Sequence, residues 1–132
     1  MPILNVKVSQ PASPALTHAI SEMLLEHTVR ILRKKRELTA IVIDYVPPEN
    51  WIVGGATLAA QGKNSFYFDI KVVDGTNTKD EKANYIAECF AGFDKLLGPL
   101  HEESYIYVQE VSADAYGFGG ATQEFRYIRS KV

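Results

Sequence analysis

The chain has 132 residues, a formal net charge of −2, 46% apolar and 23% charged residues, and one cysteine. These values are typical of one soluble globular domain and exclude a disordered or fibrous chain. No apolar run approaches the ~20 residues of a membrane span. The start has neither the basic nor the apolar region of a signal peptide, and a lone cysteine fits a reducing compartment. We expect a single cytoplasmic domain over residues 1–132, with neither nucleic acid nor a membrane as its partner.

The first half of the chain is predicted to form a strand, a helix and a strand. Residues 3–8 alternate in polarity and are rich in branched side chains, as in a strand. Ser13 and Pro14 suit the N-cap and first turn of a helix. The apolar stripe of this helix consists of Leu16, Ile20, Met23, Leu24, His27 and Ile31. Residues 40–46 form the next predicted strand, which ends before Pro47 and Pro48.

The second half shows the same order of elements. Residues 66–73 are a predicted strand, and Thr78 with Glu81 has the spacing of a capping box at a helix start. The predicted stripe of this helix consists of Ala83, Ile86, Ala87, Phe90, Phe93 and Leu97. Gly98 and Pro99 end the helix, and residues 105–111 are the last long strand.

The two halves are related as an internal repeat. Residues 41–57 align without a gap to residues 106–122, 65 positions further on, with six identical positions. The alignment places Trp51 opposite Tyr116. Upstream, Val6-Lys7-Val8 matches Ile70-Lys71-Val72 at a spacing of 64. We infer a duplicated unit, with repeat 1 at about 1–64 and repeat 2 at about 65–132.

This duplication predicts an α+β fold, an α/β sandwich. Each β-α-β unit is a right-handed crossover between parallel strands, and two units form a four-stranded mixed sheet with both helices on one face. The other face stays open. Apolar strand residues that we expect to leave it partly apolar are Ile41, Ile43, Phe66, Phe68, Tyr105 and Tyr107. Such a face predicts a homo-oligomer, for which three-fold closure is one option.

Pro2 is the first candidate for chemistry. Removal of Met1 would leave a secondary amine at the start of a strand. A free α-amine titrates near ~8, and burial lowers the pKa by favouring the neutral form. A neutral amine in an apolar pocket is a competent general base. The alternative is a proline without a chemical role.

Several motifs resemble those of the tautomerase superfamily. They are the N-terminal Met1-Pro2-Ile3, the repeat length, and an aromatic residue three positions before Gly-Gly, in Trp51-Ile52-Val53-Gly54-Gly55 and Tyr116-Gly117-Phe118-Gly119-Gly120. The single-repeat member of that superfamily is 4-oxalocrotonate tautomerase. Fused two-repeat members include cis-3-chloroacrylic acid dehalogenase and malonate semialdehyde decarboxylase. The resemblance covers nearly the whole chain.

The resemblance implies a homotrimer of two-repeat subunits that acts without a cofactor on a small molecule. Pro2 would be the catalytic base in the isomerisation of a small enol or 2-oxo acid. Trp51 and Tyr116 would line the pocket, and Tyr107 falls where the dehalogenase has a pocket tyrosine. Packing within the fold or between subunits is the alternative for each of the three aromatic residues.

The chain departs from the family pattern at the substrate carboxylate. The loops after residues 8 and 72 lack the arginines that hold this group in relatives, which leaves Lys71 or Arg126 as candidate substrate-binding cations. Glu37 lies close to an acidic position of the decarboxylase. Two alternatives follow: a hydratase, dehalogenase or decarboxylase of the same superfamily, and a catalytically inactive trimeric binding protein. The scattered histidines lack metal-ligand spacing, so we expect no metal site.

Overall fold

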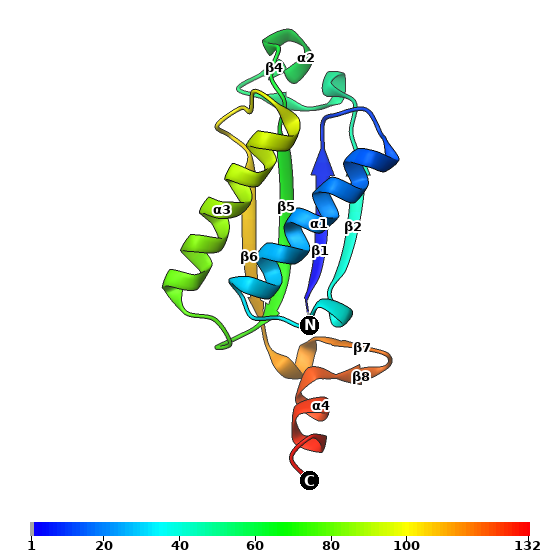
Figure 1. The fold of residues 1–132 in the computed structure, drawn as a ribbon, viewed down its shortest axis with the longest axis vertical. Helices are drawn as coiled ribbons and strands as arrows, with labels where there is room; N and C mark the ends of the chain where they lie inside the picture. The colour runs from blue at the N-terminus through cyan, green and yellow to red at the C-terminus, as the bar shows by residue number, and fades with distance from the viewer. Residues whose placement is uncertain (1) are drawn as a thin grey trace.

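The computed structural model describes residues 2–132, and Met1 lies outside the described residues. Its main sheet has four strands in the order β2-β1-β5-β6 (Figure 1). The strands are β1 (Ile3–Val8), β2 (Ala40–Tyr45), β5 (Phe66–Val73) and β6 (Tyr105–Val111). The pairs β1–β2 and β5–β6 are parallel, whereas β1 and β5 are antiparallel. The predicted mixed sheet of two β-α-β units is confirmed.

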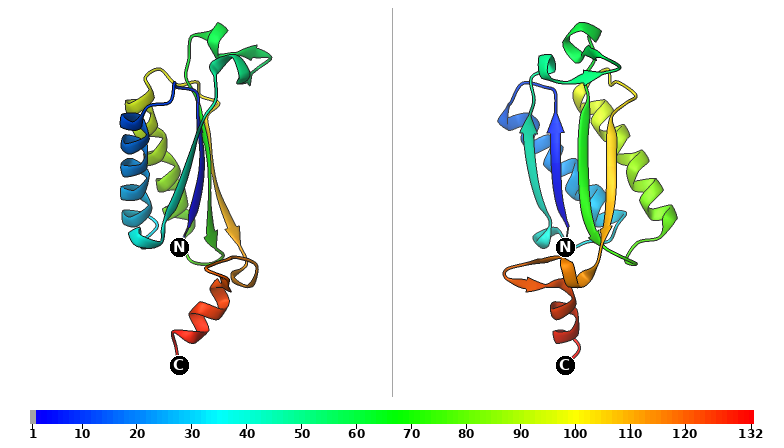
Figure 2. Two further views of the ribbon diagram at one scale, coloured as in Figure 1. Left: turned by 90° about the vertical axis from the view of Figure 1, so that its right-hand side faces the viewer. Right: turned by 180° about the vertical axis from the view of Figure 1, so that it is seen from behind.

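Two long helices, α1 (Pro14–Arg30) and α3 (Lys79–Leu97), cover one face of the sheet (Figure 2). The Ser13 side chain caps α1 by accepting an amide hydrogen bond in its first turn. Thr78 and Glu81 form the predicted capping box of α3. Both helices therefore begin where their capping residues indicate.

The core lies between the helices and the sheet, and it corrects the predicted stripe of α3. The buried positions of this helix are Tyr85, Cys89, Phe93 and Leu97. Of the predicted stripe, Ala83, Ile86 and Ala87 are exposed instead, Ile86 to 39%. The reason is aromatic packing: Phe93 stacks on Phe66 of β5 with ring centroids 4.0 Å apart. Turning these large rings inward buries more apolar surface than turning Ile86 inward would.

The open face of the sheet carries other apolar residues than four of those expected. Phe66 and Phe68 point into the core with no exposure, and Ile41 and Ile43 pack against that core. Alternation along the strands then places the neighbouring residues on the opposite face. This open face carries the polar residues Asn5, Lys7, Asp69 and Lys71 and the residues Ile3, Val42, Tyr105 and Tyr107, of which Ile3 is 38% and Val42 50% exposed. Of the six residues expected on this face, Tyr105 and Tyr107 lie there, whereas Phe66, Phe68, Ile41 and Ile43 face the core.

A small hairpin and a short helix follow the second strand of each repeat. After β2 come β3 (Ile52–Val53), β4 (Ala56–Thr57) and α2 (Leu58–Gln61). After β6 come β7 (Gly117–Phe118), β8 (Ala121–Thr122) and α4 (Gln123–Arg129). Single-turn helices are η1 (Arg36–Leu38), η2 (Pro48–Asn50) and η3 (Ala113–Ala115). The two hairpins lie at opposite ends of the sheet, and α4 projects beyond it (Figure 1).

Equivalent backbone hydrogen bonds connect the start and the end of each hairpin. The Leu58 amide donates to the Trp51 carbonyl at 2.8 Å, and the Gln123 amide donates to the Tyr116 carbonyl at 2.7 Å. Thr57 and Thr122 cap the helices α2 and α4 in the same way. The two sequence repeats thus have the same local structure. Each end of the sheet therefore carries one hairpin with a short helix, and we call these two places the corners of the sheet.

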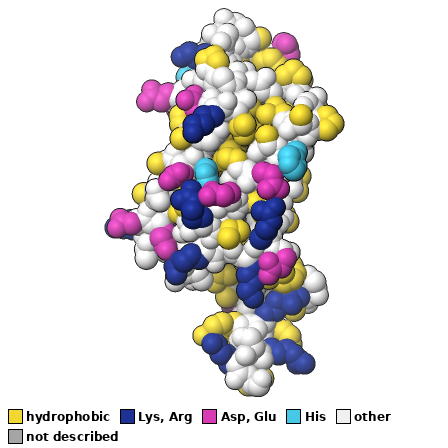
Figure 3. Space-filling view, viewed as in Figure 1, with side chains coloured by type: hydrophobic (Ala, Val, Ile, Leu, Met, Phe, Trp, Pro, Cys, Tyr) yellow, Lys and Arg dark blue, Asp and Glu magenta, His cyan; other side chains and the backbone are white. Residues whose placement is uncertain are grey.

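The surface over the helices carries both signs of charge (Figure 3). The basic side chains near the end of α1 are largely engaged by acidic partners. Arg30 pairs with Glu26 and Glu88, and two further pairs nearby are Arg33–Glu81 and Arg36–Glu22. Among residues 2–132, no helix is long and apolar enough to cross a membrane.

Candidate active site

A cavity of about 350 Å³ surrounds Pro2 at the end of the sheet where β1 begins. Pro2 is buried, and its carbonyl accepts a hydrogen bond from the Ala40 amide at 3.1 Å. Leu38, Tyr116 and Phe118 form much of the remaining wall. The site thus joins the first strand, the approach to β2 and the second hairpin, three segments far apart in sequence.

Tyr116 is hydrogen-bonded to the backbone of Ile3, the residue after Pro2. Its hydroxyl accepts from the Ile3 amide at 3.1 Å and donates to the Lys71 carbonyl at 3.2 Å. Burial raises the pKa of Tyr116 above its ordinary value, so the phenol is neutral at physiological pH. The side chain therefore ties the start of β1 to β5 and fixes the backbone that follows Pro2.

Charged groups lie at the margins of this cavity. Glu37 lines it, whereas none of the described lining residues is a lysine or an arginine. Lys71 lies on the strand beside Ile3, and its ammonium donates to Asp69 at 2.7 Å. The positive charge of Lys71 is near enough to lower the pKa of Tyr116 slightly, against the larger effect of burial. Lys71 is therefore a cation at the edge of the site and not in its wall.

Arg126 acts on the site through a neighbour. Its guanidinium donates to the Phe118 carbonyl at 2.8 Å and lies 3.9 Å from the centroid of the Phe118 ring. Gly119 in the same hairpin has φ +60°, and a Cβ there would come within 2.7 Å of the Arg126 guanidinium. In this chain Arg126 therefore holds the hairpin that carries Phe118 and does not line the Pro2 cavity.

The other two predicted aromatic residues lie elsewhere in the chain. Trp51 lines a different cavity, at the opposite end of the sheet. Tyr107 is 54% exposed on the open face, opposite Asp69. Of the six residues chosen from sequence, the structure therefore brings Pro2 and Tyr116 together and leaves Lys71 and Arg126 at the margin. Substrate binding by any of them stays a prediction.

Sequence reasoning did not select Leu38 and Phe118 as parts of the wall. Phe118 lies inside the glycine-rich motif and could have been found from its place two residues after Tyr116. Leu38 belongs to the single turn η1, for which the sequence offers no apolar periodicity. Its position beside Pro2 follows from the pairing of β1 with β2, in which Ile3 is opposite Ala40.

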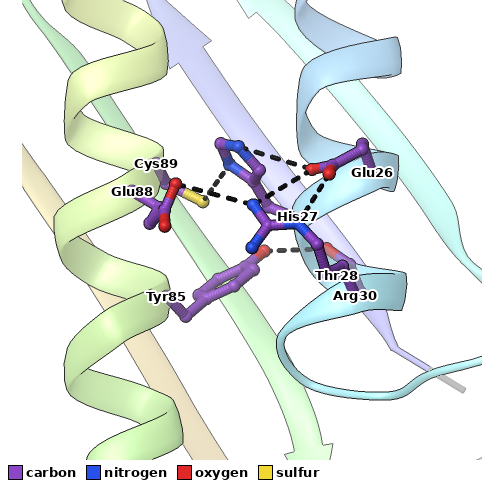
Figure 4. A network of polar contacts seen from close by, with 7 residues as sticks. All are labelled: Glu26, His27, Thr28, Arg30, Tyr85, Glu88 and Cys89. Atoms are coloured by element: carbon purple, nitrogen blue, oxygen red, sulfur yellow. Dashed lines mark hydrogen bonds and ion pairs between the residues drawn. The ribbon is translucent and has the colours of Figure 1, made fainter.

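A second polar cluster lies between α1 and α3 (Figure 4). Thr28 and Tyr85 share a buried hydrogen bond of 2.9 Å, and the Cys89 sulfur is 3.6 Å from His27 Nδ1. Burial raises the pKa of the Cys89 thiol to about 12, so the thiol is protonated and unreactive at neutral pH. This cluster joins the two helices. Within residues 2–132, no three acidic, histidine or cysteine side chains are grouped to hold a metal.

The fold is shared with solved structures of the tautomerase superfamily. An asymmetric trimer of the wild-type fused 4-OT called R7 matches with a TM-score of 0.82 and 19% identity, over 95% of this chain and 98% of that chain. A native fused 4-OT matches with a TM-score of 0.82 and 18% identity, over 93% and 97%. FG41 malonate semialdehyde decarboxylase, inhibited by 3-bromopropiolate, matches with a TM-score of 0.74 and 13% identity, over 98% and 97%.

No family model and no curated protein sequence matches the chain. The likeness therefore lies in the fold, which is the two-repeat β-α-β fold of this superfamily. The proteins that share it include enzymes, among them the decarboxylase.

Proposed function

We propose that the protein is a tautomerase-like isomerase in which the Pro2 amine, freed by removal of Met1, is the general base. The observation that carries this proposal is the position of Pro2. It is buried at the start of β1, in a cavity walled by Leu38, Phe118 and a neutral phenol. Burial against these apolar side chains favours the neutral, proton-accepting form of the amine, whereas the Glu37 carboxylate in the same wall acts in the opposite direction.

The proposed reaction moves one proton and consumes nothing. The neutral amine of Pro2 takes the proton from the enol oxygen of the substrate, and the resulting ammonium returns it to carbon to give the keto form. The backbone around the base is held on both sides, by Ala40 at the Pro2 carbonyl and by Tyr116 at the Ile3 amide. Such positioning supports proton transfer because it keeps the base within reach of the reacting atoms.

The walls of the cavity favour a small enol or 2-oxo acid with an apolar body. Leu38 and Phe118 offer apolar contact, and the cavity volume of about 350 Å³ suits a small molecule. In this proposal the ammonium of Lys71 binds the anionic group of the substrate. The Lys71 side chain is 36% exposed and also forms an ion pair with Asp69. Arg126 would take this role only by leaving Phe118 or by reaching the cavity of a neighbouring subunit.

We further propose a homotrimer in the cytoplasm. Fused 4-OT structures of this fold are trimers. The open face of the sheet and the exposed side chains of α4, which include Phe125 and Ile128, are surfaces that subunit contacts would cover. Light scattering on the purified protein measures the mass of the assembly, and a monomeric mass would contradict this part of the proposal.

Two features support alternatives. Glu37 in the cavity wall favours a decarboxylase-type reaction, in which a carboxylate lies beside the substrate. The lack of lysine and arginine among the described lining residues favours a trimeric binding protein without catalysis. Assays for release of carbon dioxide and for ketonisation of an enol separate the first alternative from the isomerase.

The decisive experiment joins intact mass with labelling of the amine. The fold neighbour Pt0534 was inactivated by 2-oxo-3-pentynoate. We expect a mass short of one methionine, and one adduct of this reagent per chain that maps to Pro2. We also expect Pro2→Ala to lower kcat for enol ketonisation by roughly 10²–10⁴. A mass that includes Met1, no adduct at Pro2, or unchanged turnover of Pro2→Ala would contradict the proline mechanism.

A further inference from the structure

A second cavity lies at the opposite end of the sheet from Pro2 and has no role in the proposed reaction. Its volume is about 930 Å³. Trp51 from the first hairpin region, Tyr67 of β5, and Glu103 and Tyr105 at the start of β6 contribute to its wall. The cavity therefore combines the aromatic side chains of Trp51, Tyr67 and Tyr105 with one carboxylate, and Phe66 and His101 also line it.

This cavity and the Pro2 cavity are built from equivalent parts of the two repeats. Tyr67 pairs with Tyr105 across β5 and β6, as Ile3 pairs with Ala40 across β1 and β2. Each cavity also takes the aromatic residue before its own hairpin, Trp51 in one and Tyr116 in the other. Because the repeats match in backbone, the differences between the cavities lie in their side chains.

Those differences change the chemistry of the corner. The equivalent of Pro2 is Phe66, which is fully buried in the core, so this cavity has no terminal amine. Three aliphatic residues of the Pro2 cavity have larger or charged equivalents in the second cavity. At the equivalent positions Tyr67 stands for Ile3, Tyr105 for Ala40 and Glu103 for Leu38. The second cavity thus has no amine, carries two phenol rings where the Pro2 cavity has one, and has its single carboxylate at Glu103 where the Pro2 cavity has Glu37.

The carboxylate of Glu103 is available to a ligand. Its Oε2 accepts from the Tyr105 hydroxyl at 2.8 Å, and this bond raises the pKa of Tyr105. Within residues 2–132, Glu103 has no ion pair with a lysine, arginine or histidine, and no lysine or arginine lines the cavity. His101 does line it, and its Nδ1 accepts from the Glu103 amide at 3.1 Å. The charge at this site is therefore not neutralised by the described part of the chain.

We propose that this second cavity is a binding site for a small organic cation, an alkylammonium or quaternary ammonium group. The rings of Trp51, Tyr67 and Tyr105 would contact the cation through their negative π faces, and Glu103 would supply the opposite charge. A neutral or anionic molecule of the same shape gains neither interaction. The site is distinct from the Pro2 cavity, so its ligand need not be the substrate.

Trp51 makes this proposal directly measurable, because it is the single tryptophan of the chain and lines the cavity. The probe is choline, and its neutral isostere 3,3-dimethylbutan-1-ol is the matched control. Titration of the full-length oligomer, followed by tryptophan emission at constant ionic strength, should show saturable binding of choline. We expect the neutral isostere to bind roughly 5- to 30-fold more weakly, the range that a cation–π contact covers between an exposed and a desolvated site.

Variants test the charge separately from the shape. Glu103→Gln keeps the size of the side chain and should weaken choline binding roughly fivefold or more. Glu102→Gln removes the adjacent charge, which does not line the cavity, and should leave binding within a factor of about two. Equal affinity for choline and the neutral isostere, or equal effects of the two variants, would overturn the proposal. A Trp51 emission that responds to neither probe would also overturn it, and would indicate a cavity filled by a second copy of the chain.

Discussion

Replacing Tyr116 with phenylalanine tests how the start of β1 is held. The variant removes a hydroxyl that accepts from the Ile3 amide at 3.1 Å and donates to the Lys71 carbonyl at 3.2 Å. A neutral hydrogen bond contributes about 0.5–1.5 kcal/mol, so two would contribute about 1–3 kcal/mol. Ile3 is exposed, and water can hydrate its freed amide in part. We therefore expect the free energy of unfolding to fall by about 1–2 kcal/mol.

Urea unfolding at one fixed protein concentration measures this change, because the stability of an oligomer depends on concentration. Tyr127→Phe is the matched control. Tyr127 lies on α4 and is 66% exposed, so removal of its hydroxyl should change the free energy of unfolding by less than about 0.5 kcal/mol. The comparison separates loss of the Tyr116 bonds from the general effect of removing a phenol.

Activity provides the second measurement on Tyr116→Phe. If the hydroxyl positions the backbone that follows Pro2, kcat for enol ketonisation should fall several-fold while KM changes little. A variant as stable as the parent protein would refute the structural part of this reasoning. A destabilised variant with unchanged kcat would show that the bonds hold the fold without positioning the base.

Three further predictions concern the helix contact, its pH dependence and the second hairpin. Thr28→Val and Tyr85→Phe should each cost about 1–3 kcal/mol, since each leaves a buried hydroxyl without its partner, and the double variant should cost less than their sum in a denaturant cycle. Burial lowers the pKa of His27, so the unfolded chain binds that proton more readily. Stability should therefore fall as pH drops below ~6.5 toward the folded pKa, and His27→Gln should flatten this part of a stability–pH curve; an unchanged slope would contradict the assignment. Gly120→Ala meets only the strain of φ +80°, whereas Gly119→Ala at φ +60° also meets the Arg126 guanidinium at 2.7 Å. Both should lower the melting temperature, at a cost of about 1 kcal/mol for the strain, and equal shifts would show that the Arg126 contact has no energetic role.

The elements of the fold could be predicted because local patterns specify them. Alternation specifies the strands, and capping residues specify where α1 and α3 begin. The internal repeat then specifies two pairs of parallel strands, because each β-α-β crossover makes its strands parallel. Pro2 at the start of a strand, and an aromatic residue before each Gly-Gly, were also readable as site candidates.

Tertiary structure alone decided which of these residues meet. β5 runs antiparallel to β1, so the two repeats are inverted and their corners lie at opposite ends of the sheet. Tyr116 therefore joins Pro2, and Trp51 belongs to the second cavity. The buried side of α3 was likewise decided by packing, because Tyr85 and Phe93, two of the largest fully buried side chains, contact the rings of Phe66 and Phe68. Periodicity gives the elements and their spacing, whereas burial and strand direction determine which side chains share a site.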